Sequence, residues 1–138
     1  MDALRDRLPA LAAALWWGSL SAIGFVAVPL LFRHLASPAA AGQMAAQLFE
    51  AQTYISIACC ACLFLLSKRK HSEKEEPWAQ AAMVFLIGGL LAALLLQYGA
   101  APRIVARQSL ALWHGVGSVL YAAQWLCALG VLWRTVRQ

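Results

Sequence analysis

Four long apolar stretches account for most of this 138-residue chain, and they constrain its fold more than any other feature. They cover about residues 8–32, 41–66, 77–101 and 108–133, and each is long enough for the roughly 20 residues of a membrane-spanning helix. Hydrophobic residues make up 62% of the chain and charged residues 12%, whereas a soluble domain has about 45–50% and 25%. We therefore predict an all-α fold, an integral membrane four-helix bundle that forms a single transmembrane domain over residues 1–138.

The basic residues predict the orientation of this bundle in the membrane. Eight of the eleven flank one side of the expected helices: Arg5, Arg7, Lys68, Arg69, Lys70, Lys74, Arg134 and Arg137. Three flank the other side: Arg33, Arg103 and Arg107. The positive-inside rule then places both termini and the 67–77 loop in the cytoplasm. Because the positive charges stand at block edges and form no patch, the net charge of +5 indicates a lipid bilayer as partner and no nucleic acid.

The N-terminal segment has the basic start and apolar run of a secretory signal peptide. However, its apolar run continues through Trp16, Trp17 and Phe25 without a clear small-residue cleavage site. We therefore expect a retained first helix. Together with the basic bias, a retained helix suits a multi-pass protein of the bacterial inner (plasma) membrane.

The second apolar stretch carries a row of polar residues at helical spacing. Gln43, Gln47, Glu50 and Tyr54 are separated by four, three and four residues, so a helix places them on one face. A charged side chain at mid-membrane costs about 2.5–3.5 kcal/mol on insertion scales. We therefore expect this face to turn toward the bundle interior or a wet cavity.

The fourth stretch presents a matching row, and basic residues lie toward the same outward side. His114, Ser118 and Tyr121 again share a helix face, while Arg33 and Arg103 follow prolines at the outward ends of the first and third stretches. We therefore predict a membrane protein that binds or transports a small molecule or ion through an outward-facing polar pocket. Its predicted ligand-binding residues are Arg33, Gln47, Glu50, Tyr54, Arg103, His114 and Ser118. Two arginines favour a small anionic ligand, and Glu50 with His114 could relay a proton in coupled transport. The structural alternatives are that Arg33 snorkels to the interface and that His114 is a hydrogen-bonded core residue.

Other chemistry receives less support. Cys59 and Cys62 share a helix face with Cys127 at comparable depth, and three thiolates would suit Cu(I), but free cysteine is also an ordinary small core residue. We therefore predict no metal site. His34 and His114 could serve as haem ligands, as inward histidines do in some membrane bundles. No recognisable catalytic set occurs, so we expect neither enzymatic activity nor a cofactor.

Small residues at spacing four suggest a further class of function. Such stripes let helices approach closely, and three occur: Ala14, Gly18 and Ala22; Gly88 and Ala92; Gly89 and Ala93. We expect them to mark helix contacts. They leave open a homo-oligomer or a membrane-protein partner, with this chain as a structural or accessory subunit of a membrane complex.

Several motifs in order resemble one family. They are F-V-A-V-P-L-L-F-R-H-L (25–35), A-G-Q-M-A-A-Q-L-F (41–49), A-P-R-I-V-A-R (101–107) and H-G-V-G-S-V-L-Y (114–121). Together they resemble the transmembrane protein 205-like family, small four-helix membrane proteins catalogued as a domain of unknown function. The resemblance implies a four-span bundle without enzymatic activity. Its hallmark residues map to Phe32, Arg33, Gly42, Leu48, Phe49, Pro102, Arg103, His114, Gly115 and Ser118. Glu50 departs from the family pattern.

Overall fold

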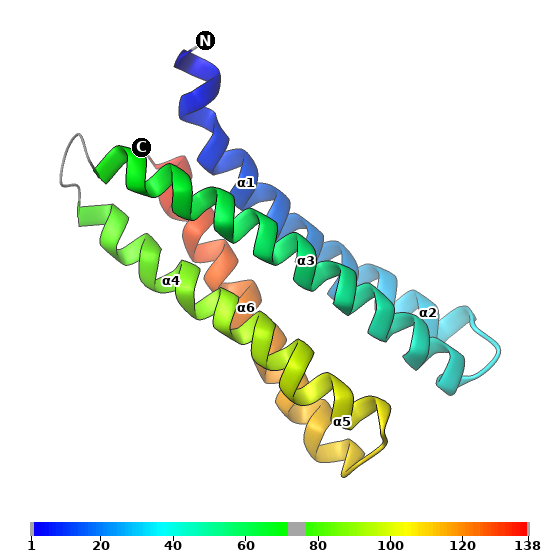
Figure 1. Cartoon of the computed structure of the whole chain (residues 1–138). Helices are drawn as coiled ribbons and strands as arrows, with labels where there is room; N and C mark the ends of the chain where they lie inside the picture. Colours follow the sequence, from blue (N-terminus) through cyan, green and yellow to red (C-terminus); the bar gives the residue numbers. More distant parts are fainter. Residues whose placement is uncertain (1, 72–76, 138) are drawn as a thin grey trace.

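The chain forms an antiparallel bundle of four long helical segments (Figure 1). This computed structural model describes the backbone of residues 2–71 and 77–137 and the side chains of residues 7–67 and 81–137. The segments are α1 (Asp2–Ala22), η1 (Ile23–Ala27) and α2 (Val28–His34); α3 (Pro38–His71); α4 (Pro77–Leu94), η2 (Leu95–Ala100) and α5 (Ala101–Val105); and α6 (Leu110–Val136). The described residues contain no strand, and the predicted all-α class is confirmed.

Each of the four segments is long and apolar enough to cross a membrane. The candidate spans are Arg7–His34, Pro38–Ser67, Ala81–Val105 and Leu110–Val136. The start of α1 and the end of α6 lie at one end of the bundle, as four antiparallel spans require (Figure 1). That this end is cytoplasmic follows from the charge distribution and stays a prediction. We call the opposite end the outer end.

The helix boundaries differ from the predicted ones at several ends: α1 starts at Asp2 and α3 at Pro38, ahead of the predicted residues 8 and 41, and two segments extend past their predicted ends. The α3 helix continues to His71, so the first five residues of the predicted 67–77 loop are helical; residues 72–76 lie outside the described part of the chain. The third segment continues past its predicted end at residue 101 to Val105. Charged residues can extend a membrane helix into water because its backbone hydrogen bonds are internal and do not depend on the solvent.

Pro29 and Pro102 lie inside helical segments near the outer end, and neither ends its helix. Proline lacks an N–H and its ring crowds the carbonyl four residues before it. The widened π turns η1 and η2 end two residues before Pro29 and Pro102, with Val28 N–H donating to the Ile23 carbonyl and Ala101 N–H to the Leu96 carbonyl. Such i to i−5 bonds displace the crowded carbonyls, so the chain continues to the outer rim.

The helices pack in the cyclic order α1, α3, α4, α6, so that α1 lies diagonally opposite α4 and α3 opposite α6. Fully buried Trp16 bridges the first diagonal, because a Cβ added at Gly89 would lie 2.6 Å from the Cη2 atom of Trp16. The predicted contact at Gly89 is therefore confirmed. The α1 stripe behaves differently: Ala14 and Ala22 are exposed, and nothing lies within 4 Å of a Cβ added at Gly18. Its prediction as a contact is wrong within this chain.

Two short connections close the outer end. Ser37 caps α3, since the Ala40 N–H donates to the Ser37 Oγ at 3.2 Å, and Pro38 takes the first helical position. The α5–α6 turn needs left-handed backbone at Arg107 (φ 55°) and Ser109 (φ 40°). In Figure 1 the first hairpin, from α1 to α3, diverges at the outer end from the second hairpin, from α4 to α6. The α2 helix contacts α3 but, among described residues, neither α5 nor α6.

Candidate functional site

The structure does not gather the seven predicted ligand-binding residues into a pocket. All seven side chains are exposed: Arg33, Gln47, Glu50, Tyr54, Arg103, His114 and Ser118. The expectation that the polar row on α3 turns into the bundle is wrong, because the opposite face of that helix carries the buried residues. The outer part of α6 is exposed because α2 diverges from it. Whether these residues bind a ligand stays a prediction.

The polar row on α3 instead forms an outward-facing surface, which we call the α3 polar face: Gln43, Gln47, Glu50 and Tyr54. Its one internal contact is a long hydrogen bond, in which the Tyr54 hydroxyl donates to the Glu50 Oε1 at 3.4 Å. Gln43 and Gln47 have no hydrogen-bonding partner among the described residues. The amides of Gln43 and Gln47 and the second carboxyl oxygen of Glu50 are therefore available for hydrogen bonds to another molecule.

The inner part of the α3 polar face, at Glu50 and Tyr54, lies deep in the expected membrane. Glu50 is 12 residues from the start of the Pro38–Ser67 span, which is about 18 Å along a helix at 1.5 Å per residue. The whole span is about 45 Å long by the same rise, and the hydrocarbon core is about 30 Å thick. A span centred on the bilayer thus places Glu50 roughly 10 Å inside the hydrocarbon.

The outer rim is basic, and its polar groups are satisfied locally. Arg103 donates from Nη1 to the Gly99 carbonyl at 2.7 Å, and its Cζ atom lies 4.4 Å from the ring centroid of Trp113. Ser118 donates to the carbonyl of His114 at 2.8 Å. The contacts of Arg103 and Ser118 thus stay within the second hairpin, and neither reaches Glu50.

A buried polar cluster at the bundle centre was missed by the sequence analysis. Ser56 accepts hydrogen bonds at Oγ from the Nε2 of Gln124 at 2.7 Å and from the Nε2 of Gln52 at 3.3 Å. Gln52 also donates to the Oγ of Ser19 at 3.0 Å. Gln52, Ser56 and Gln124 are 2%, 0% and 2% exposed. This cluster joins α1, α3 and α6, and its sequence signal was the i, i+4 pair Gln52 and Ser56.

The buried cluster is not fully satisfied. The Oε1 of Gln52 and the indole Nε1 atoms of Trp16 and Trp17 are buried without a hydrogen-bonding partner. Buried polar atoms of this kind are usual binding points for internal water. Since the amide nitrogens already bond serine hydroxyls, the arrangement favours a structural role within the bundle.

Tyr121, which the sequence placed beside His114, is a packing residue. Its hydroxyl donates to the Leu20 carbonyl at 2.6 Å, and its ring lies 5.3 Å from that of Phe49 in an edge-on arrangement. Its ring also fills the space that a side chain at Gly24 would occupy. It therefore fixes α6 against η1 and α3 just below the diverging outer end.

The structure does not bring together the residues of the two alternative sites, the cysteine metal site and the histidine haem site. Across the described residues no group of three or more His, Cys, Asp or Glu side chains is placed to hold a metal ion, and Cys59, Cys62 and Cys127 are not gathered into one. His34 and His114 are both exposed. As haem ligands they would have to lie inside the bundle, so the structure does not favour that alternative.

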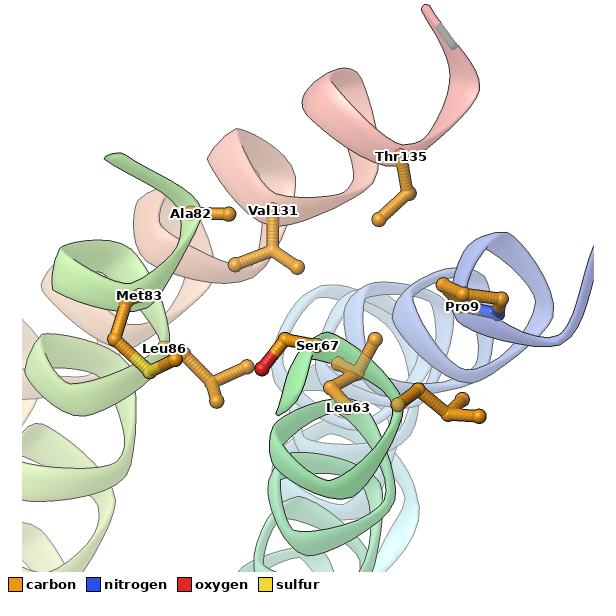
Figure 2. Close-up of a pocket in the computed structure, with 9 residues that line it drawn as sticks. Pro9, Leu63, Ser67, Ala82, Met83, Leu86, Val131 and Thr135 are labelled. Carbon is orange, nitrogen blue, oxygen red and sulfur yellow. The ribbon is translucent and has the colours of Figure 1, made fainter. Parts of the chain in front are cut away.

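A small apolar pocket opens at the end of the bundle where α1 begins (Figure 2). It is lined by Pro9, Leu63, Leu66, Ser67, Ala82, Met83, Leu86, Val131 and Thr135. Its two hydroxyls are taken up within their own helices, Ser67 donating to the Phe64 carbonyl and Thr135 to the Leu132 carbonyl. The pocket therefore offers no convergent polar groups that would orient a ligand.

Comparison with known proteins assigns the chain to a family but not to an activity. Residues 11–111 match the family described as Domain of unknown function (DUF4149), and because this is most of the chain, the protein belongs to that family. No curated protein and no solved structure matches.

Proposed function

We propose that this DUF4149 protein is a non-enzymatic assembly subunit of a membrane complex, in the bacterial inner membrane, and that the α3 polar face binds another membrane protein. One observation carries the proposal. The carboxyl group of Glu50 is exposed on the outside of the bundle at a depth where the surroundings of a lone bundle are acyl chains.

The energetics favour a protein partner over lipid at this face. A charged group near the centre of a spanning helix costs about 2.5–3.5 kcal/mol when it faces lipid, and natural examples almost always face protein or a water-filled cavity. Within the described chain, Glu50 has a single weak hydrogen bond from Tyr54. A neighbouring helix with polar groups would satisfy Glu50, Gln47 and Gln43 together.

The α1 stripe supports the same function. Ala14, Gly18 and Ala22 leave a strip on the outside of α1 where no side chain fills the space above Gly18. Small residues on a lipid-facing helix allow a second backbone to approach closely. The bundle thus has two outward surfaces suited to helix contacts and an interior filled by its own side chains.

Photo-crosslinking in native membranes tests the proposal. A photoreactive amino acid is placed at Tyr54, and the matched control carries it at Leu91, an exposed residue on α4. We expect a protein adduct of defined mass from position 54 and none from position 91. If position 54 reacts with lipid alone, as the control does, the chain does not assemble through this face.

A second candidate function is binding or transport of a small anionic molecule at the outer rim. Its supporting observation is Arg103, whose guanidinium group is held in one orientation by Gly99 and Trp113 and remains exposed. Arg33 is exposed at the same end. In this reading Glu50 and His114 could still carry a proton. The resemblance to the transmembrane protein 205-like family is compatible with both functions, since it implies no activity.

Ligand stabilisation separates this candidate from the first. Purified protein is heated with a panel of small anions, and the double variant R103A/H114A is compared with the unchanged chain. Anion binding at the rim predicts a rise in Tm that the double variant loses. Equal Tm shifts in both proteins would remove the rim from consideration.

A further inference from the structure

We infer that the partner bound by the α3 polar face is a second copy of this chain, paired α3 to α3 in a symmetric dimer. This inference rests on the proposed assembly function and names its partner. It follows from the depth, the spacing and the hydrogen-bonding chemistry of four exposed residues on one helix.

Symmetry brings like residues together. Two copies with the same orientation in a membrane are related by a two-fold axis along the membrane normal, as in closed dimers generally. Each residue on α3 then meets its own counterpart at the same depth. A face that pairs with itself must therefore consist of groups that can bond to identical groups.

The α3 polar face meets this requirement. A glutamine amide both donates and accepts, so Gln43 and Gln47 can each pair with their own copies. Two Glu50 carboxyl groups can pair through a hydrogen bond when they share a proton, since one then donates to the other. The Tyr54 hydroxyl, which already contacts Glu50 within one chain, is a further donor at this level.

A basic partner helix is the main alternative, because a lysine or arginine would neutralise Glu50. That alternative explains one residue of the four. It gives no reason for the two glutamines, which need donors and acceptors in equal number. The self-pairing arrangement satisfies all four residues at once, and for that reason we favour a second copy.

The spacing of the face fits two packed helices. Residues 43, 47, 50 and 54 follow the four-three-four spacing of a coiled-coil seam, in which such residues face the partner helix along the contact. Ala51, Ala58 and Ala61 are exposed on the same side of α3. Their small side chains allow the close approach that interhelical hydrogen bonds between glutamines require.

Disulfide formation tests the seam directly. Gln47 is replaced by cysteine in the full chain, and the control is V119C on α6. Both positions lie nine residues from the outer ends of their spans, and both are exposed. Under mild oxidation in membranes we expect a disulfide-linked dimer from Q47C. Neither V119C nor the unchanged chain, which reports on its native cysteines, should give that dimer.

The association constant in bilayers supplies a second readout, measured by energy transfer between labelled copies. Replacing Gln47 or Glu50 by leucine removes interhelical hydrogen bonds, so we expect weakening of about 3- to 20-fold, the equivalent of roughly 0.6–1.7 kcal/mol. E50Q keeps a donor and an acceptor and should stay within about threefold. V119L should not change the association. Because these residues are exposed, we expect all variants to fold.

The outcomes separate this inference from the function on which it rests. A Q47C dimer together with weaker association of E50L supports the symmetric seam. A photo-adduct from position 54 with a different protein, without self-crosslinking, overturns the inference and leaves the assembly function standing. Monomers without any protein adduct overturn both.

Discussion

The contact between Trp16 and Gly89 gives the sharpest test of the fold. Trp16 is completely buried, and its indole crosses the bundle from α1 to the backbone of α4. A Cβ added at Gly89 would lie 2.6 Å from Cη2 and 2.9 Å from Cζ2 of this ring, and 3.0 Å from the Cβ of Cys127. The variant G89A must therefore displace a large, enclosed side chain.

The expected magnitude follows from two opposing effects. Overpacking a filled core costs about 1–3 kcal/mol, and replacing glycine by alanine within a helix returns about 1 kcal/mol. G89A should therefore be destabilised by about 0–2 kcal/mol. The matched variant G18A gains the helix effect without a clash, because nothing lies within 4 Å of its new Cβ. The two variants should differ by about 1–3 kcal/mol.

Reversible unfolding in detergent micelles measures this difference. Both variants and the unchanged chain are titrated under one set of conditions, and the free energies of unfolding are compared. We expect G18A to be at least as stable as the unchanged chain and G89A to be the least stable of the three. If G89A is as stable as G18A, the indole does not occupy the space above Gly89 and the helix order is wrong.

Two further predictions concern the interior. S56A should lose about 1–3 kcal/mol of unfolding free energy, because the buried amides of Gln52 and Gln124 lose a shared acceptor. The control S118A removes an exposed hydroxyl that bonds its own helix, so its unfolding free energy should stay within about 0.5 kcal/mol of the unchanged chain. Equal losses in the two variants would contradict a central polar cluster. Y121F should lose about 0.5–1.5 kcal/mol, since its hydroxyl bonds the Leu20 carbonyl, and an unchanged stability would contradict that bond; the same unfolding titration measures both.

The sequence was sufficient for the class of the fold. Bilayer thickness sets the length of an apolar helix, and four stretches of that length leave no room for another architecture. The sequence did not predict how the first and third segments continue as helices past Pro29 and Pro102. Proline predicts a broken hydrogen bond, but a π turn that relieves the crowding depends on how the whole helix packs.

The candidate site was harder to predict because periodicity shows which residues share a face but not where that face points. The α3 helix carries polar residues on two faces, Gln47 and Glu50 on one and Gln52 and Ser56 on the other. A charge argument favours burying Glu50. The structure buries the other pair, because Gln124 on α6 reaches Ser56 and satisfies it inside the bundle.

This division of polar residues also explains why assembly is the better-supported function. Hydrophilic groups in a membrane protein need partners, and the amide nitrogens of the inner set find them in Ser19 and Ser56, which leaves the Oε1 of Gln52 unpaired. The outer set, Gln43, Gln47, Glu50 and Tyr54, has one weak hydrogen bond among the described residues. A bundle whose centre is occupied by its own side chains has little space for a ligand, whereas an unsatisfied outer face has a defined requirement for a neighbouring helix. The polar groups that folding leaves without strong partners therefore lie on the α3 polar face.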